Sequence, residues 1–364
     1  MVWSTAFIRE LRRNIPNTKI DIIINNNHKE LFKECSYVDT VFGYECNDLD
    51  KPVDEKVLIK AKEYYNNRIK IKYDAVFLPR LLPSGLADAW ENVILALESG
   101  AKIRYAHSYY VSDRDCAIVD SVECYFTNIS KHLFGQSEVR SKLDLITDNR
   151  GIVLDEKMEL WLSNVDKEYA NKIIEPNGIK VAVGLVGSNP NRCWSPCRYT
   201  EVIKRINDKY KDKDIKFVLM GGDDAIDASK IILENIDINL INLVNKTSLS
   251  RAISVVNMCD IYLGSDTGLM HVAAAFKKYV IELSAASEET PSYWGSSPER
   301  TGPWKTKFQI LKAEKPLPGC GCYCSMPVPH CINQITVDDV VAALENALLE
   351  KLYKRSTCPL RIQE

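Results

Sequence analysis

A regular alternation of strand and helix patterns in the second half of the chain constrains its fold most. Short apolar runs rich in Val, Ile and Leu predict buried strands at residues 180–186, 216–220, 239–244, 260–263 and 279–283. Between successive strands, apolar residues recur at helical spacing over 197–210, 225–234, 248–256 and 269–276. Strands that alternate with helices form parallel sheets covered on both faces. This half is therefore predicted to be a doubly wound α/β domain.

The first half of the chain repeats the alternation less regularly. It opens on a predicted helix over residues 5–16, with no strand before it. Further strands are predicted at 19–25, 40–42, 73–78 and 101–105, and further helices at 28–35, 55–69, 86–98 and 113–134. Charged, irregular residues at 151–178, which end in Pro176-Asn177-Gly178, predict the connection between the two halves.

The length of the chain sets the expected number of domains. With 364 residues, of which 46% are hydrophobic, the chain exceeds what one compact core usually holds. We predict an N-terminal domain over 1–165, a C-terminal domain over 178–336 and a closing helix over 337–353.

Charge and apolar patterning exclude several classes of function. Lys and Arg number 47 against 49 Asp and Glu, so the formal net charge is -2, and no global basic surface indicates binding to nucleic acid. No run approaches the roughly 20 apolar residues that span a bilayer, and no signal-peptide pattern opens the chain. These features predict a cytoplasmic globular protein whose anion-binding sites are local.

One predicted anion site lies where the strand ending at Leu263 turns into a helix, in the sequence LGSDTGLMH. Backbone N–H groups at a helix start, together with the helix dipole, favour a phosphate. Gly268 would let a ligand approach the backbone, and His271 lies one turn after Thr267 on the same helix face. A second interpretation is that Asp266 and Thr267 only cap the helix and that His271 is packed in the core.

Two other loops follow strands and therefore emerge at the same carboxyl edge of the sheet. The loop at 187–196 carries Ser188 and Arg192, and the Arg192 guanidinium would offset the charge of a departing diphosphate without a metal. The loop at 220–224 carries Asp223, a carboxylate placed to accept hydrogen bonds from ribose hydroxyls. Alternatively, Arg192 is an ordinary solvated arginine and Asp223 caps a helix.

Taken together, these segments resemble glycosyltransferase family 9, the heptosyltransferases of lipopolysaccharide core synthesis, over nearly the whole chain. The motifs that carry the resemblance are DTGLMHVAAA at 266–275, GS at 187–188 with RCWSP at 192–196, GGD at 221–223, KTSL at 246–249 and the segment 331–341. The resemblance implies a GT-B architecture, an α/β fold with two Rossmann-like domains that face each other across a cleft.

The resemblance also implies the substrates. The C-terminal domain would bind a nucleotide-sugar donor, usually ADP-heptose, and the N-terminal domain would meet a lipid-linked saccharide acceptor, with peripheral contact at the inner membrane. No cofactor is implied. Transfer would invert the anomeric centre, with a carboxylate base that deprotonates the acceptor hydroxyl. The donor-binding residues implied by the motifs are Ser188, Arg192, Asp223, Thr247, Asp266, Thr267, Gly268 and His271. Among these, Asp266 would shape the turn, Asp223 would bind the ribose and Thr247 would line the base pocket.

The start of the chain departs from the family pattern. The base is typically an Asp in a Gly-Asp pair between the first strand and the first helix, and this sequence begins at Met1, directly after the expected place of that pair. Either the chain is a fragment, or it is a natural form without the base and a central strand. We favour a fragment, because losing a central strand would leave backbone groups unpaired. No catalytic base is assigned. Asp88 would either line the cleft or, as we favour, be a solvated helix carboxylate.

Other functional hypotheses stay open at this point. A non-catalytic nucleotide-sugar-binding protein of the same fold would suit the missing base, and a GT-B epimerase would need cleft carboxylates that the sequence does not locate. For the acceptor, Arg80 together with Arg9, Arg12, Arg13 and Lys19 would suit a partner rich in phosphate. The alternative is that these basic residues form a solvated helix face.

Cysteines cluster near the end of the second domain. Of the 12 cysteines in the chain, Cys320, Cys322, Cys324 and Cys331 lie close together and adjoin His330. The spacing C-x-C-x-C-x6-C is not a standard zinc pattern, and cysteines at alternate positions of an extended segment point to opposite sides. We therefore predict no bound metal, with a zinc ion or an iron–sulfur centre as the alternative. Because the family tends to carry cysteines here, the resemblance implies a structural or thiol role for these cysteines.

Overall fold

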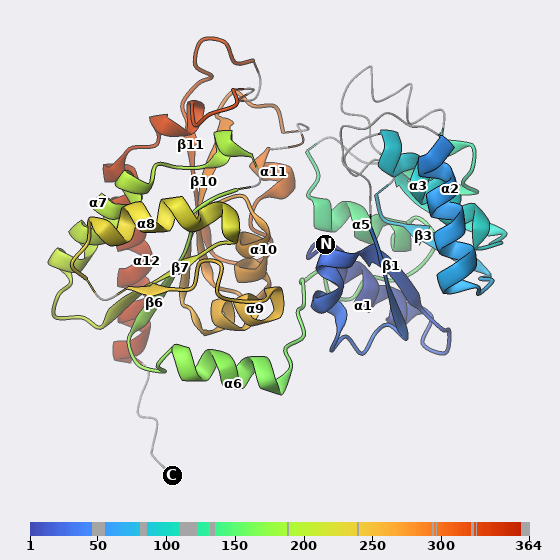
Figure 1. Ribbon diagram of the computed structural model, residues 1–364, viewed down its shortest axis with the longest axis horizontal. Coiled ribbons are helices and arrows are strands. Elements are labelled where there is room, and N and C mark those ends of the chain that lie inside the picture. Colours follow the sequence, from blue (N-terminus) through green and yellow to red (C-terminus); the bar gives the residue numbers. More distant parts are fainter. Residues whose placement is uncertain are drawn as a thin grey trace. The chain divides into compact units, whose positions relative to one another are not determined.

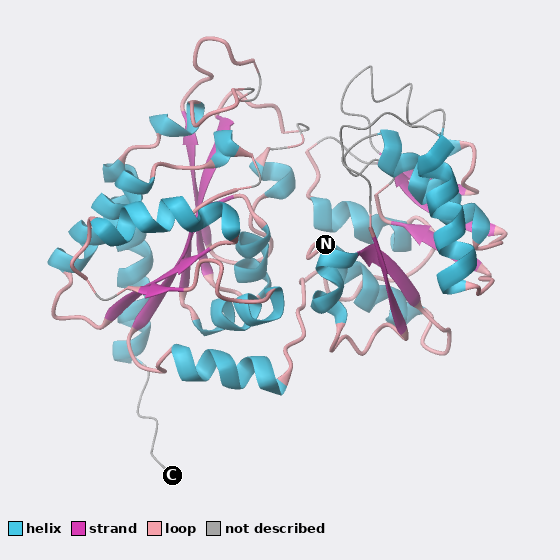
Figure 2. Ribbon diagram, in the orientation of Figure 1, coloured by secondary structure: helices cyan, strands magenta, loops and turns pink. Residues whose placement is uncertain are grey.

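The computed structural model describes residues 1–45, 55–80, 86–108, 122–131, 135–187, 189–238, 240–292, 295, 297–321, 324 and 326–357. Two compact units divide the chain. Unit 1 consists mainly of Trp3–Trp161, and unit 2 consists mainly of Leu162–Pro291 and Ser296–Glu364. Each unit contains its own parallel strands flanked by helices (Figure 1; Figure 2).

Unit 2 is built on one six-stranded parallel sheet with the strand order β11-β10-β9-β6-β7-β8. Its strands are β6 (Ile179–Gly184), β7 (Ile215–Met220), β8 (Ile241–Asn242), β9 (Ile261–Ser265), β10 (Tyr279–Ser287) and β11 (Phe308–Ala313). β6 and β9 are buried along their whole length, which explains their nearly continuous apolar sequences. Four of the predicted strands match β6, β7, β9 and β10, whereas the fifth shortens to β8 and β11 was not predicted.

Helices cover both faces of the sheet of unit 2. The helices α7 (Pro196–Lys209), α8 (Ile226–Glu234) and α12 (Val337–Thr357) share one hydrophobic core with Val183, Leu263 and Ile281. The helices α9 (Leu249–Met258) and α10 (Gly268–Ala275) lie on the other side of the sheet (Figure 1). Because side chains alternate along a strand, Leu263 faces α12 while Tyr262 faces α10.

The direction of the chain across this sheet reverses between β6 and β9. From β6 it moves outward through β7 and β8, and from β9 it moves outward the other way through β10 and β11. Open α/β sheets bind their ligands at such a switch point, outside the carboxyl ends of the strands. The loops that follow β6 and β9 are therefore where a ligand is expected.

Unit 1 contains two separate parallel sheets among its described residues. In one, β1 (Asp21–Asn25) pairs with β2 (Thr40–Tyr44), and in the other the order is β3 (Ala75–Leu78), β4 (Ile103–Ser108), β5 (Asn128–Lys131). The accompanying helices are α1 (Ser4–Asn14), α2 (Glu55–Tyr64), α3 (Leu86–Glu98) and α5 (Glu138–Thr147). No strand pairing joins the two sheets within the described part of the chain.

Two predicted helices of unit 1 are wrong in part. The helix expected at 28–35 is the 3₁₀ segment η1 (Asn26–Phe32), where the Asn25 side chain accepts a hydrogen bond from the Asn27 N–H. Asn side chains compete with the backbone in this way, which disfavours a regular α-helix. The helix expected at 113–134 contains β5 instead, because Ile129 pairs with Ala106 of β4. Residues 109–121 and 132–134 lie outside the described residues.

Two further segments differ from expectation. The predicted helix at 55–69 ends as α2 at Tyr64 and continues as the π-helical turn η2 (Tyr65–Ile69). The segment 151–178, expected to be irregular, contains α6 (Asn164–Ile173). Ser163 caps this helix by accepting a hydrogen bond from the Asp166 N–H at 3.0 Å, and α6 packs on α9.

Two basic residues of α1, Arg9 and Arg12, are held by contacts within unit 1. Arg9 is buried, its Nε lies 3.0 Å from Glu10 Oε1, and its Nη1 donates to the Lys157 carbonyl at 2.8 Å. Arg12 pairs with Asp39 at 2.6 Å. These contacts occupy both guanidinium groups and give Arg9 and Arg12 structural roles. Arg13 and Lys19 are exposed, and a role of the basic residues toward an acceptor stays a prediction.

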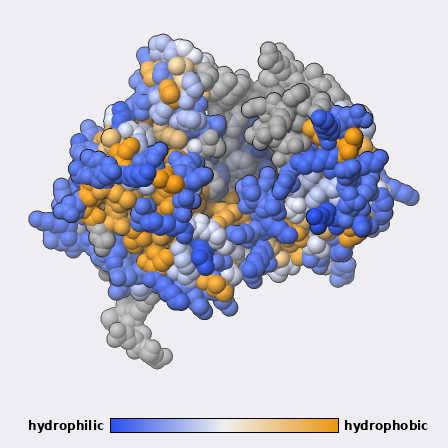
Figure 3. Space-filling view, viewed as in Figure 1, coloured by the Kyte–Doolittle hydropathy of each residue, from blue (hydrophilic) through white to orange (hydrophobic). Residues whose placement is uncertain are grey.

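Polar residues cover much of the face of the molecule drawn in Figure 3, and apolar side chains reach the surface over α8. On that helix Ile231 is 37% exposed and Leu233 is 41% exposed. Exposed apolar residues are common in globular proteins. No described helix is both long enough and apolar enough to cross a membrane.

Candidate functional site

The loops that follow β6 and β9 are held against each other at the switch point of unit 2. We call residues 189–195 and 266–268 the switch-point loops. Ser265 donates a hydrogen bond from its Oγ to the Arg192 carbonyl. A Cβ added to Gly187 would lie 3.3 Å from the Arg192 Cβ and 3.7 Å from the Thr267 methyl group. The fold thus brings together two segments that are 74 residues apart in sequence.

Asp266 is the centre of this arrangement. Its Oδ1 lies 3.2 Å from His271 Nε2, and its Oδ2 accepts a hydrogen bond from the Thr301 hydroxyl at 3.1 Å and lies 3.5 Å from Arg192 Nη1. Burial by itself would raise the pKa of Asp266. The hydrogen bond from His271, the charges of His271 and Arg192, and the Thr301 hydroxyl together outweigh burial and lower that pKa. Asp266 is therefore an ionised carboxylate that fixes three side chains.

The start of α10 is open. Thr267 is its N-cap residue, but the Thr267 side chain makes no capping hydrogen bond to the described residues, and its Oγ1 lies 3.0 Å from the Tyr262 hydroxyl instead. No described atom lies within 4 Å of the position that a Cβ on Gly268 would take. The interpretation that Thr267 only caps the helix is therefore wrong. Uncapped N–H groups beside open space form an anion-binding arrangement.

His271 is buried, as the interpretation of a packed core histidine predicts, and it also contacts Asp266. It lies on α10, and its backbone N–H donates to the Thr267 carbonyl at 3.3 Å. Its Nε2 contacts the Asp266 carboxylate. His271 thus positions the Asp266 carboxylate, and its direct contact with a ligand stays a prediction.

Tyr262 and Thr301 belong to the site but were not predicted. The Tyr262 hydroxyl lies over two paired glycines, Gly184 of β6 and Gly264 of β9, and a Cβ on either glycine would collide with it. These aligned glycines are a sequence signal for a large side chain packed across the sheet. Thr301 ends the short helix α11 (Pro298–Thr301), in a segment without a recognisable motif. Only the fold brings Thr301 to Asp266.

Glu282 is a buried carboxyl group that was also missed. It pairs in register with Gly264 on the sheet face that α10 covers. Neither of its carboxyl oxygens has a hydrogen-bond partner among the described residues. Burial, reinforced by the negative charge of Asp266, raises the pKa of Glu282 well above its usual value, so the protonated form is favoured. A single acidic residue inside the apolar run YVIEL is the corresponding sequence signal.

Asp223 and Thr247 lie in the loops after β7 and β8, residues 221–225 and 245–248, which we call the outer loops. The Asn245 N–H donates to the Gly221 carbonyl at 3.0 Å, which joins the two loops. Asp223 is exposed, and its Oδ1 accepts a hydrogen bond from the Asp224 N–H at 3.0 Å. Thr247 is half-buried. The structure thus groups Asp223 with Thr247 and groups Arg192 with Asp266, Thr267, Gly268 and His271.

The remaining predicted site residues are Ser188 and Arg80. Ser188 lies outside the described residues. Arg80 follows β3 in unit 1 and is half-buried, and its role toward an acceptor stays a prediction. The side chain of Asp88 is also not described.

Comparison with known proteins identifies the family. A model of glycosyltransferase family 9 (heptosyltransferase) matches residues 100–327, a range that contains both switch-point loops and both outer loops. The chain belongs to glycosyltransferase family 9. It is 22% identical over 371 residues to lipopolysaccharide heptosyltransferase 3 of Escherichia coli K12, and the match covers 96% of this chain and 95% of that protein.

Solved structures of family 9 glycosyltransferases share the fold. The enzyme from Veillonella parvula superposes with a TM-score of 0.72 at 17% identity, covering 96% of this chain and 94% of that one. Escherichia coli heptosyltransferase WaaC with ADP superposes with a TM-score of 0.66 at 14% identity, covering 95% of each chain. The predicted GT-B class of α/β fold is therefore confirmed, and the chain is an enzyme of the glycosyltransferase class.

Proposed function

We propose that this family 9 glycosyltransferase transfers heptose from ADP-heptose to an acceptor of the lipopolysaccharide-core type, with inversion of the anomeric centre. The names of its relatives support the sugar and the acceptor class, and the solved WaaC structure with ADP supports the nucleotide. The observation that carries the proposal is the open start of α10 beside Arg192 at the switch point of the sheet.

The proposed diphosphate site follows from these groups. The first N–H groups of α10 and its dipole stabilise the β-phosphate, and the absence of a side chain at Gly268 lets that phosphate approach the backbone. Arg192 adds a positive charge, and Thr267, His271 and Ser188 complete the proposed contacts. Asp266 acts as a positioning residue, because it holds Arg192 and His271 in place.

The proposed reaction is a single displacement. The acceptor oxygen forms a bond to the anomeric carbon while the bond from that carbon to the β-phosphate oxygen breaks, and the hydroxyl proton passes to a carboxylate base. The charge that develops on the departing diphosphate is stabilised by Arg192 and by the start of α10. We assign no base among the described residues.

The outer loops supply the rest of the proposed donor site. Asp223, whose carboxylate is exposed at the carboxyl edge, accepts hydrogen bonds from the ribose hydroxyls. Thr247, which the bond between Asn245 and Gly221 holds beside that loop, lines the base pocket.

We further propose that Arg80 contacts a lipid-linked acceptor and that the protein meets the membrane peripherally. Membership in a family of glycosyltransferases favours an enzyme over the binding protein and the epimerase considered above.

Gly268→Ala tests the proposed diphosphate site. The new methyl group enters open space in the free protein, so the variant folds with unchanged thermal stability, but this methyl occupies space that the β-phosphate needs. Calorimetric titration with ADP is expected to show a dissociation constant raised about 10- to 100-fold, equivalent to about 1.4 to 2.8 kcal/mol. Release of ADP from ADP-heptose in the presence of acceptor should fall in parallel.

Lys167→Ala is the control, because Lys167 is exposed on α6, outside the switch-point loops and the outer loops. It should bind ADP as the wild type does. Equal ADP affinity of Gly268→Ala and the wild type would contradict the proposed site. ADP binding without turnover of any heptose donor would contradict the proposed transfer.

A further inference from the structure

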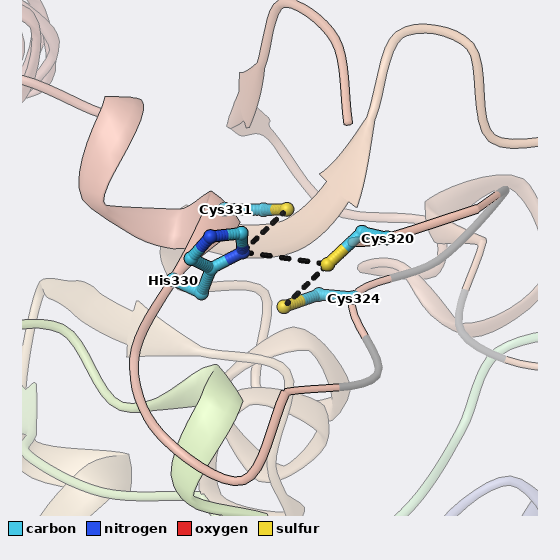
Figure 4. Close-up of side chains that lie close together, drawn as sticks. All are labelled: Cys320, Cys324, His330 and Cys331. Carbon is cyan, nitrogen blue, oxygen red and sulfur yellow. Dashed lines mark hydrogen bonds between the residues drawn. The ribbon is translucent and has the colours of Figure 1, made fainter. Parts of the chain in front are cut away.

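Four potential metal ligands converge in the loop between β11 and α12, far along the chain from the switch-point loops. They are Cys320, Cys324, His330 and Cys331, which we call the Cys3His cluster (Figure 4). One potential ligand atom from each residue, three Sγ atoms and a histidine ring nitrogen, lies within 4.8 Å of the other three. Cys324 and Cys331 are buried, and the other two are half-buried.

Three distances in the cluster are close to the edges of a tetrahedron around a zinc ion. With Zn–S at about 2.3 Å and Zn–N at about 2.0 Å, tetrahedral angles place two sulfurs about 3.8 Å apart and a sulfur and a nitrogen about 3.5 Å apart. The Sγ atoms of Cys320 and Cys324 are 3.8 Å apart. Nδ1 of His330 lies 3.3 Å from Cys320 Sγ and 3.6 Å from Cys331 Sγ. A disulfide, by contrast, requires about 2.05 Å between sulfurs.

The surroundings of the cluster suit a closed metal site. The Leu317 N–H donates to Cys331 Sγ at 3.5 Å, which is the kind of outer hydrogen bond that orients a thiolate ligand. Ala313, Leu317 and Met326 pack against the buried cysteines. The objection that alternate cysteines point apart does not apply to Cys320 and Cys324, because they are separated by three residues, within zinc-site spacing. Cys322 lies outside the described residues.

We propose that the Cys3His cluster binds one Zn²⁺ ion in a structural site. Three thiolates and one imidazole satisfy the four-coordinate preference of zinc, and four protein ligands leave no position for water or substrate. The role is therefore to hold the loop and not to take part in the transfer reaction. No S–S bond joins the cysteines within the cluster, so their thiols are reduced. Reduced cysteines are the form that binds zinc.

The loop that zinc would hold supports one of the switch-point loops. Asn191 Nδ2, next to Arg192 in sequence, donates to the Cys324 carbonyl at 2.6 Å. Trp194 Nε1 and Arg198 Nη1 donate to the Ile335 carbonyl at 3.1 and 2.8 Å. Among the described residues between β11 and α12, the only helical segment is η5 (Cys331–Gln334). A metal cross-link would therefore fix a segment that has little regular structure of its own and that braces the Arg192 loop.

Metal analysis of the full-length protein tests this proposal without reference to its activity. The protein is purified under reducing conditions, without chelator and without an added metal. Inductively coupled plasma mass spectrometry is expected to find about one zinc ion per chain. Cys324→Ser and Cys331→Ser should each lose most of the zinc. Cys197→Ser, which changes an exposed free cysteine on α7, should retain it.

A conservative variant guards against simple misfolding. His330→Cys keeps four ligands and should retain zinc, whereas His330→Ala should release it to a colorimetric chelator at least tenfold faster than the wild type. Replacement of the metal by Co²⁺ should give the intense visible bands of a tetrahedral thiolate site. Wild-type protein without stoichiometric zinc, with iron in its place, or with a Cys320–Cys324 disulfide would overturn the proposal. So would full zinc content in Cys324→Ser and Cys331→Ser.

Discussion

Two pairs of loops leave the same edge of the sheet of unit 2, and they are built differently. The switch-point loops are locked together by the Ser265 bond to the Arg192 carbonyl and by the Asp266 network. The outer loops are joined by one backbone hydrogen bond, and Asp223 is exposed. The comparison shows that one sheet edge supports a tightly connected loop pair, where we propose that the diphosphate binds, next to a more exposed loop pair. Rigid placement matters most where charge develops during the reaction.

Asp266→Ala should have the largest effect of any change at this edge. It leaves the buried His271 and Thr301 side chains and the partly exposed Arg192 without their shared acceptor, and breaking a buried ion pair typically costs about 3 to 5 kcal/mol. The free energy of unfolding, measured with denaturant, should fall by about 3 kcal/mol and kcat/KM by at least about 100-fold. Asp223→Ala, at the exposed position, should change the unfolding free energy by less than about 0.5 kcal/mol. Similar destabilisation by both variants would show that the two loop pairs do not differ as described.

Arg192→Ala should weaken nucleotide binding more than it weakens the fold. Removing one charge-assisted contact to a diphosphate is expected to raise the dissociation constant for ADP about 10- to 100-fold in calorimetry. Arg192→Lys keeps the charge but loses the planar guanidinium, and should recover only part of this affinity. An ADP affinity unchanged in Arg192→Ala would place the diphosphate elsewhere.

Glu282→Leu should stabilise the protein, in contrast to changes at Asp266. The buried oxygens of Glu282 lack partners among the described residues, and replacing such a group by an apolar one of similar size gains about 1 to 2 kcal/mol at pH 7. Because its pKa is raised in the folded state, Glu282 contributes stability that is fully present below its ordinary value of 4.5 and is lost as the pH rises through the folded pKa. Denaturant unfolding between pH 4 and pH 8 should show this decline in the wild type and a weaker decline in the variant. Identical pH profiles would contradict the buried position of Glu282.

Asp223→Ala should have the smallest effect, confined to the ribose. The dissociation constant for ADP is expected to rise about 3- to 10-fold, as for the loss of one or two solvated hydrogen bonds. Binding of inorganic pyrophosphate, which has no ribose, should be unchanged in this variant and weakened in Arg192→Ala. Weaker pyrophosphate binding in Asp223→Ala would mean that the outer loops also hold the phosphates.

Most of the framework of unit 2 was predictable because its strands are buried on both faces and therefore read as apolar runs between amphipathic helices. The grouping of Arg192 with Asp266 was also predictable, since parallel strands end at one edge. The contribution of Thr301 was not, because a short helix in an irregular segment carries no periodic signal. In unit 1, β5 was mistaken for a helix, since a four-residue strand around one Ile has too little pattern to identify. The convergence of Cys320 and Cys324 with His330 depends on the path of a loop, which residue spacing alone does not determine.

A crystal structure of the protein with ADP would test most directly the proposal that the start of α10 binds the diphosphate. The expected result is a β-phosphate within hydrogen-bond distance of the Gly268 N–H and the Arg192 guanidinium, with the ribose toward Asp223. ADP bound away from the switch-point loops, with the space in front of Gly268 still empty, would contradict it.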